Sequence, residues 1–198
     1  VIAPIVAVYL LLDWDNMIAR INDLIPRDHA PVVRRLAGEI DATLSAFVRG
    51  MGSVCLILGI YYAVALMAVG LNFGLVVGLV AGLVTFIPYV GALVGGALAL
   101  GLGLFQFWGD WSSLAIVAGI FFAGQMIEGN YLTPKLVGSS VGLHPVWLLL
   151  ALSVFGALFG FIGMLIAVPL AATLGVLARF VTAQYLESRL YRGLSGKE

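Results

Sequence analysis

The residues best suited to chemistry stand together in the second half of the sequence. Gln125 and Glu128 are three positions apart, a spacing that places both side chains on one face of a helix. Asn130, Thr133 and Lys135 add further donors and acceptors just beyond them. A carboxylate beside an amide can carry a proton, bind a cation or accept hydrogen bonds from a hydroxyl-rich solute. We predict that these five residues line the pathway of a substrate or an ion.

Two structural interpretations of the same residues stay open. Glu128 and Lys135 could form an ion pair, or a neighbouring amide could satisfy the carboxylate at the end of a helix. Pro134 has no N–H group and disfavours helical geometry in the residue before it. The sequence therefore predicts that this helix ends near Leu132.

The surroundings of Glu128 are almost free of charge. From Gly50 to Ala178 the only charged residues are Asp110, Glu128 and Lys135, and 62% of the whole chain is hydrophobic. An ionisable group at membrane depth costs about 2.5 to 3.5 kcal/mol on insertion scales and is kept mainly where it is used. The pattern predicts an all-α, polytopic transmembrane protein whose partner is the lipid bilayer.

Other classes of function find no support in the sequence. The formal net charge is zero, so no basic field indicates nucleic-acid binding. Two histidines and one cysteine do not make a zinc site, and neither a His-Glu-x-x-His nor a Gly-x-Ser-x-Gly motif is present. We expect no enzyme activity, no metal and no cofactor.

Two long apolar blocks are interrupted by turn-forming residues. The block from Asn72 to Phe107 is broken at Pro88–Gly91, and the block from Leu143 to Ala178 is broken at Phe159–Gly163. Each half is short for a full crossing, so the breaks predict interrupted helices or re-entrant hairpins that frame a binding site. Ordinary paired spans with short turns are the alternative.

Within these breaks, individual residues have expected roles. Pro88, Tyr89 and Gly91 are predicted to belong to the pathway, with Tyr89 as a gate or stacking surface. The expected hinge residues of the second block are Gly160, Gly163 and Pro169. Small residues repeated every four positions (Gly74, Gly78 and Gly82) predict close packing between helices in lipid.

The chain divides into four predicted parts. Residues 1–12 resemble the tail of a transmembrane helix whose beginning is missing, and residues 13–49 form an amphipathic connector at the membrane interface. Residues 50–180 form the transmembrane transport core, and residues 181–198 form a tail. Arginine enrichment in the connector and basic residues in the tail place both on the cytoplasmic side.

Several short motifs together resemble the autoinducer-2 exporter family of bacterial permeases. They follow the family's order over nearly the whole chain: Tyr9–Asp15, Phe86–Gly91, Gln125–Pro134, Val137–Gly138, Gly142–Pro145, Phe159–Met164 and Ala167–Pro169. The resemblance implies a multi-pass protein of the bacterial inner membrane that exports the quorum-sensing furanone autoinducer-2, or exchanges sodium for protons in some members. It also implies a homo-oligomer, specifically a pentamer.

The functional hypothesis is a secondary transporter that exports a small polar solute such as autoinducer-2. No ATP-binding motif is present, so a gradient of the solute or of an ion such as H⁺ or Na⁺ would drive it. A monovalent cation/proton antiporter and a membrane scaffold without transport activity are the alternatives. The sequence leaves the substrate, the coupling ion and the direction of transport open.

Overall fold

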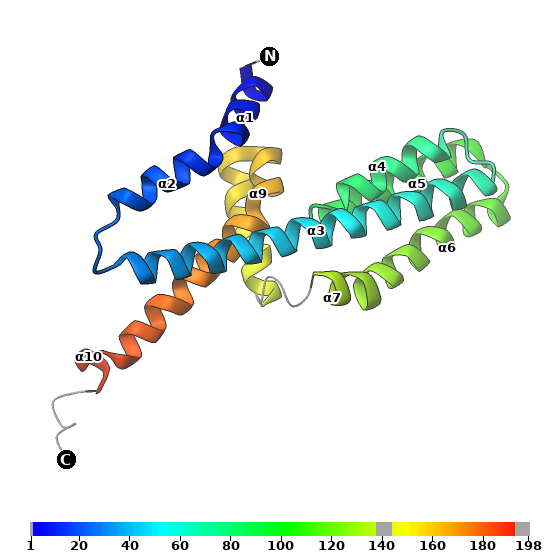
Figure 1. Cartoon of the computed structure of the whole chain (residues 1–198). Coiled ribbons are helices and arrows are strands. Elements are labelled where there is room, and N and C mark those ends of the chain that lie inside the picture. The colour runs from blue at the N-terminus through cyan, green and yellow to red at the C-terminus, as the bar shows by residue number, and fades with distance from the viewer. Residues whose placement is uncertain (1, 138–143, 193–198) are drawn as a thin grey trace. The chain divides into compact units, whose positions relative to one another are not determined.

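The computed structural model describes residues 2–137 and 144–192, and all regular secondary structure in these ranges is helical (Figure 1). This confirms the expected all-α fold. The chain forms two compact units, Val1–Asp41 and Ala42–Glu198. Two of the family-like motifs reach into residues 138–143, and the predicted tail extends past residue 192; those positions lie outside the described residues.

The first unit contains α1 (Ile2–Leu12), α2 (Trp14–Leu24) and the beginning of α3 (Ala30–Ala68). Backbone hydrogen bonds continue from α1 into α2 through Asp13, whose N–H donates to the Tyr9 carbonyl (3.0 Å). Exposed apolar residues recur along α2 (Trp14, Ile18, Ile21 and Leu24). They give α2 the amphipathic face expected of the connector.

Helix α3 runs from Ala30 to Ala68 without a break. Pro31 lies in its first turn, where the missing N–H has no intrahelical partner to lose. The predicted limit between connector and transport core, at residues 49 and 50, falls inside this helix. One helix therefore carries the charged end of the connector directly into the apolar stretch that begins at Gly50.

In the second unit, α4 (Gly74–Val84), α5 (Val90–Gln106) and α6 (Trp111–Ile127) pack around α3 (Figure 1). The shared core consists of buried residues from all four helices: Val54, Leu58, Tyr62, Val77, Ala81, Ala99 and Val117. Gly78 and Gly82 lie against the α3 backbone at Ala63 and Gly59, where a Cβ atom would overlap with main-chain atoms. Close packing through small residues is thus confirmed for α3 and α4.

Polar side chains close the bundle at one end. Gln106 Oε1 accepts from the Asn72 N–H (2.6 Å), and its Nε2 donates to the Gly70 carbonyl (2.7 Å), which fastens the end of α5 to the α3–α4 loop. Asp110 caps α6 by accepting hydrogen bonds from Ser112 and Ser113, and these bonds lower the pKa of Asp110 to about 2. Asp110 is therefore ionised at neutral pH, between two exposed tryptophans that suit a membrane–water interface.

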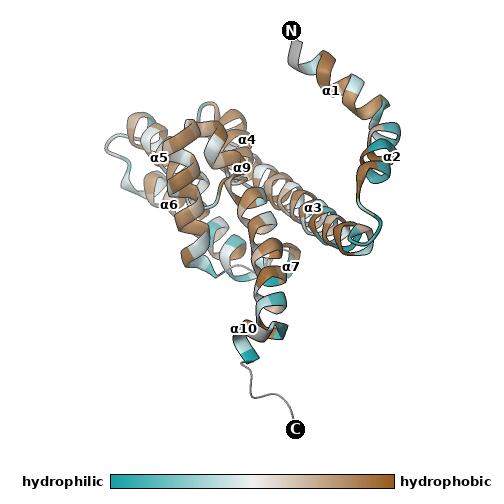
Figure 2. Ribbon diagram, turned by 90° about the vertical axis from the view of Figure 1, so that its left-hand side faces the viewer, coloured by the Kyte–Doolittle hydropathy of each residue, from teal (hydrophilic) through white to brown (hydrophobic). Residues whose placement is uncertain are grey.

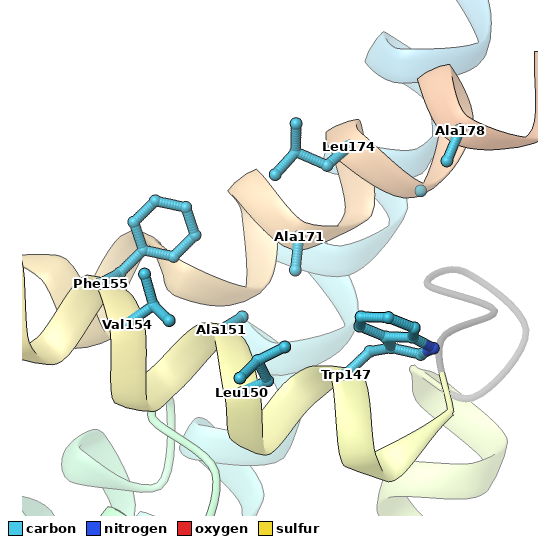
Figure 3. Close-up of a pocket in the computed structure, with 9 residues that line it drawn as sticks. Trp147, Leu150, Ala151, Val154, Phe155, Ala171, Leu174 and Ala178 are labelled. Carbon is cyan, nitrogen blue, oxygen red and sulfur yellow. The ribbon is translucent and has the colours of Figure 1, made fainter. Parts of the chain in front are cut away.

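The second interrupted block is α9 (Pro145–Glu187), followed by the short α10 (Arg189–Arg192). Its backbone leaves helical geometry at Gly160, with φ 62° and ψ −140°, and the two limbs on either side lie next to each other (Figure 3). Ala151 of the first limb and Ala167 of the second share one apolar cluster with Ile87, from the turn between α4 and α5. The break expected at Phe159–Gly163 is confirmed at Gly160.

Hydropathy differs between the helices of the chain. Apolar residues dominate α4, α5, α6 and α9, whereas hydrophilic residues gather on α2 and α10 (Figure 2). Among the described residues, three helices are long and apolar enough to cross a membrane: Ala30–Ala68, Trp111–Leu136 and Pro145–Glu187. The α4 and α5 helices are apolar but shorter.

Candidate functional site

The candidate site lies where α6 changes its helical form. After Ile127 the chain makes a π-helical turn, η1 (Glu128–Leu132), and then continues as α7 (Thr133–Leu136). The Thr133 N–H donates to the Glu128 carbonyl, one residue further back than in an α-helix. This wider turn lets the helix pass Pro134, which has no N–H to donate, so the prediction that the helix ends near Leu132 is wrong. Such π turns are frequent at functional sites.

Gln125 and Glu128 meet as their spacing predicts. Gln125 Nε2 donates to Glu128 Oε2 (3.1 Å) and also to Tyr62 Oη of α3 (3.2 Å). If the amide were flipped, its oxygen would face the carboxylate, and two acceptors cannot form a hydrogen bond. The Gln125 nitrogen therefore faces Glu128 when that group is ionised. The pair thus forms a polar contact between α6 and α3 in an otherwise apolar bundle.

Tyr62 is the site residue that the sequence analysis missed. Its side chain is 1% exposed, and its ring stacks on Phe121 with 5.3 Å between the centroids. Its hydroxyl donates to the Phe121 carbonyl (3.5 Å) while accepting from Gln125. Gly124 makes room for the ring, because a Cβ atom there would overlap with it. A tyrosine within an apolar run was an available signal, since a buried hydroxyl usually has a hydrogen-bond partner.

Contacts between α3 and α6 give the depth of Glu128. The two helices run antiparallel: Tyr62 meets Gly124, and Gly50 meets Leu136 near the other end. Glu128 lies between these two contacts along the chain, next to the charge-free part of α3. Its charge also acts electrostatically on two α3 side chains, Cys55 and Tyr62. The half-buried carboxylate therefore lies inside the apolar stretch Trp111–Leu136, in its second half.

The other predicted pathway residues of this segment do not join the pair. Asn130 is exposed and donates to the Met126 carbonyl of its own helix (2.9 Å), and Thr133 is half-buried. Lys135 is exposed, with its ammonium group 5.3 Å from the Tyr131 ring centroid. No ion pair between Glu128 and Lys135 is found in the described parts of the chain. Of the two structural interpretations, the amide contact is the one present.

The turn between α4 and α5 lies at a different level from Glu128. Phe86 packs edge-on against Phe47 of α3, with 5.7 Å between the ring centroids. Phe47 precedes the charge-free part of α3, so the turn reaches the connector end of that stretch rather than its middle. Tyr89 follows with φ 65° and 54% exposure, and within the described residues no hydrogen bond or ring contact joins Pro88, Tyr89 or Gly91 to the Gln125–Glu128 pair.

The predicted hinge residues all lie in α9. Gly160 forms the break itself, and Gly163 packs closely against the Phe155 backbone of the opposite limb. Pro169 lies within the second limb, and its carbonyl accepts from the Thr173 hydroxyl (3.0 Å).

A groove of about 490 Å³ separates parts of the two α9 limbs (Figure 3). Its lining is apolar throughout: Trp147, Leu150, Ala151, Val154, Phe155, Ala171, Leu174, Gly175 and Ala178. It contains no residue of the Gln125–Glu128 pair and offers a polar solute almost no hydrogen-bond partner. The polar contact between α3 and α6 is the better candidate site.

Comparison with known proteins identifies relatives along nearly the whole chain. The model of the family described as "AI-2E family transporter" matches residues 1–183. The chain is 33% identical over 174 residues to "Putative transport protein YrrI" of Bacillus subtilis, covering 88% of this chain and 48% of that protein. It is 32% identical over 178 residues to "Putative permease PerM" of Escherichia coli K12, covering 86% and 48% respectively.

The chain thus spans about half the length of the curated relatives that it matches. No solved structure shows significant similarity to it.

Proposed function

The chain belongs to the AI-2E family of transporters, and on that basis we propose that it moves a small polar solute or ion across the bacterial cytoplasmic membrane. The connector and the C-terminal end of α9 lie on the cytoplasmic side in this proposal, because both carry arginines beside apolar segments. An even number of crossings joins them.

The observation that carries this proposal is the position of Glu128. A carboxylate inside an apolar, membrane-spanning helix is costly in lipid and occurs mainly where it faces a bundle interior or a hydrated cavity. Here it faces α3 and is held by Gln125, while the apolar faces of α6 carry the exposed Phe122 and Ile116. A scaffold without transport activity has no use for such a pair at this depth.

The chemistry of the pair indicates the class of solute. In the described structure, neither Gln125 Oε1 nor Glu128 Oε1 takes part in a hydrogen bond with protein. Two free acceptor oxygens suit a molecule that brings hydroxyl donors, such as autoinducer-2, with H⁺ as the coupling ion. Export driven by a gradient of the solute or of an ion agrees with the absence of an ATP-binding motif in the sequence.

A monovalent cation/proton antiporter is the second candidate, because a carboxylate oxygen and an amide oxygen are also ligands for Na⁺. A homo-oligomer, a pentamer by family resemblance, accompanies either function. Sodium-driven dequenching of a pH-sensitive dye in vesicles, without any response to the furanone, would favour the antiporter.

Flux measurements in proteoliposomes test the proposal. We expect wild-type protein to move furanone, Na⁺ or H⁺ with a clear dependence on pH, and Glu128→Gln to lose that dependence while it assembles normally. Asp110→Asn is the matched control, because it changes the exposed capping carboxylate of α6 in the same way. Unaltered pH dependence in Glu128→Gln, or no flux of any tested solute in wild type, would overturn the proposal.

A further inference from the structure

Tyr62 makes more specific contacts than a core aromatic needs. Its hydroxyl uses both of its hydrogen-bonding roles, accepting from Gln125 Nε2 and donating to the Phe121 carbonyl. Its ring is fixed by Phe121 on one face and by Tyr61, whose centroid lies 5.3 Å away. The side chain therefore has one position, set by packing on α3 and α6 together.

The Gln125 amide depends on that position. One N–H of Nε2 points at Tyr62 and the other at Glu128, so the hydroxyl on α3 determines the direction in which the amide donates. With the nitrogen held in this way, Gln125 Oε1 has no protein partner within the described residues, and it lies in the same amide plane.

We propose that Tyr62 is the positioning residue of this transport site: it fixes the Gln125 amide so that Gln125 Oε1 and Glu128 Oε1 together receive the donor groups of the solute. The inference rests on the proposed function, and it gives Tyr62 of α3 a role in a site whose other members, Gln125 and Glu128, belong to α6 and η1. It also restricts the solute to a class that donates to two oxygens, a polyhydroxylated molecule or a hydrated cation, and excludes anions.

The chain supplies a matched control in the adjacent residue. Tyr61 is also a tyrosine of α3 whose hydroxyl donates to a carbonyl of α6, that of Ile120 (3.1 Å). It makes no hydrogen bond to Gln125 among the described contacts. Tyr61→Phe and Tyr62→Phe therefore remove equivalent atoms and one backbone hydrogen bond each, but only Tyr62→Phe frees the Gln125 amide.

The groups around Glu128 limit the ways in which Tyr62→Phe can alter the pH profile of flux. From α3 these are Cys55 and Tyr62, and on its own helix Gln125 is the hydrogen-bond partner while Lys135 is exposed and turned to Tyr131. Tyr62→Phe leaves the other groups in place. An effect on the pH profile thus reports on the amide rather than on a new charge.

The experiment compares the two variants and Glu128→Gln with wild type in proteoliposomes, using furanone and Na⁺ as separate probes. For Tyr62→Phe we expect an increase in KM of about threefold to tenfold, as for the loss of one hydrogen bond, and a pH midpoint of flux that differs from wild type. Tyr61→Phe should keep the wild-type KM and midpoint. Both variants should have a lower melting temperature in detergent than wild type, and Tyr62→Phe the lower of the two, because it loses the Gln125 contact as well as a backbone hydrogen bond.

Two negative outcomes are distinguishable. If Glu128→Gln abolishes pH-dependent flux but Tyr62→Phe and Tyr61→Phe behave alike, the positioning role is refuted and the proposed function stands. If Glu128→Gln keeps the wild-type pH profile, the proposed function itself fails.

Discussion

Glu128 shares its amide donor with a tyrosine of another helix, and this sharing explains how a carboxylate is held at such depth. One oxygen receives the Gln125 N–H, and the amide is itself held by Tyr62. Because an unpaired buried charge is far more costly than a hydrogen-bonded one, each member of this chain of contacts stabilises the next. The geometry depends on Gly124, which admits the tyrosine ring.

Gly124→Ala should destabilise the protein and impair transport. The new methyl group overlaps with a ring that cannot move away, since Tyr62 is buried and stacked on Phe121. Overpacking of this kind costs about 1 to 3 kcal/mol. Thermal unfolding in detergent measures the change, with Gly119→Ala on the same helix as the control, because its Cβ atom meets nothing within 4 Å. Equal melting temperatures for the two variants would contradict this account.

Sequence alone predicted one half of the site. The spacing of Gln125 and Glu128 placed them on one face, and the charge-free surroundings of Glu128 indicated its depth. As a tyrosine within an apolar run, Tyr62 could be expected to have a hydrogen-bond partner, but its partner could not be predicted, because helical periodicity contains no information on which helices pair. Asn130 and Lys135 were expected at the site for their chemistry, yet the π-helical turn directs them to neighbours in their own segment.

At the scale of elements, breaks in the two apolar blocks have different structural causes. The turn before α5 includes Tyr89, which has a positive φ of 65°, and Ile87, whose side chain is 1% exposed in the cluster with α9. The break in α9 rests on Gly160, in a backbone region that residues with a Cβ atom rarely adopt. Gly and Pro in the sequence predicted both breaks. The level on α3 at which the first turn lies could not be predicted, because it depends on the packing of Phe86 against Phe47.

Gly160→Ala should therefore open or distort the α9 hairpin. A Cβ atom at φ 62° and ψ −140° is strained regardless of the space around it, at about 1 to 3 kcal/mol. Gly101→Ala in α5 is the control, since it also faces open space but has ordinary helical geometry. Limited proteolysis and thermal unfolding should show that Gly160→Ala is less stable than Gly101→Ala. A Gly160→Ala protein as stable as Gly101→Ala would show that the break does not depend on glycine.

At the scale of the whole molecule, a charged connector continues directly into an apolar bundle through α3. The bundle holds the Glu128 carboxylate next to α3 through Gln125 and Tyr62, and family membership links the chain to transport. For transport through this site, we propose that Glu128 lies within the membrane and is nevertheless in contact with water.

Accessibility of position 128 to a water-soluble reagent tests this claim most directly. In a Cys55→Ser background, which removes the single native thiol, Glu128→Cys and Phe122→Cys place thiols on the same helix, at the site and on its exposed apolar face. We predict that a charged methanethiosulfonate reagent modifies the thiol introduced by Glu128→Cys in intact vesicles and leaves that of Phe122→Cys unmodified. Equal reactivity at both positions, or protection at position 128 alone, would contradict a hydrated site at this depth.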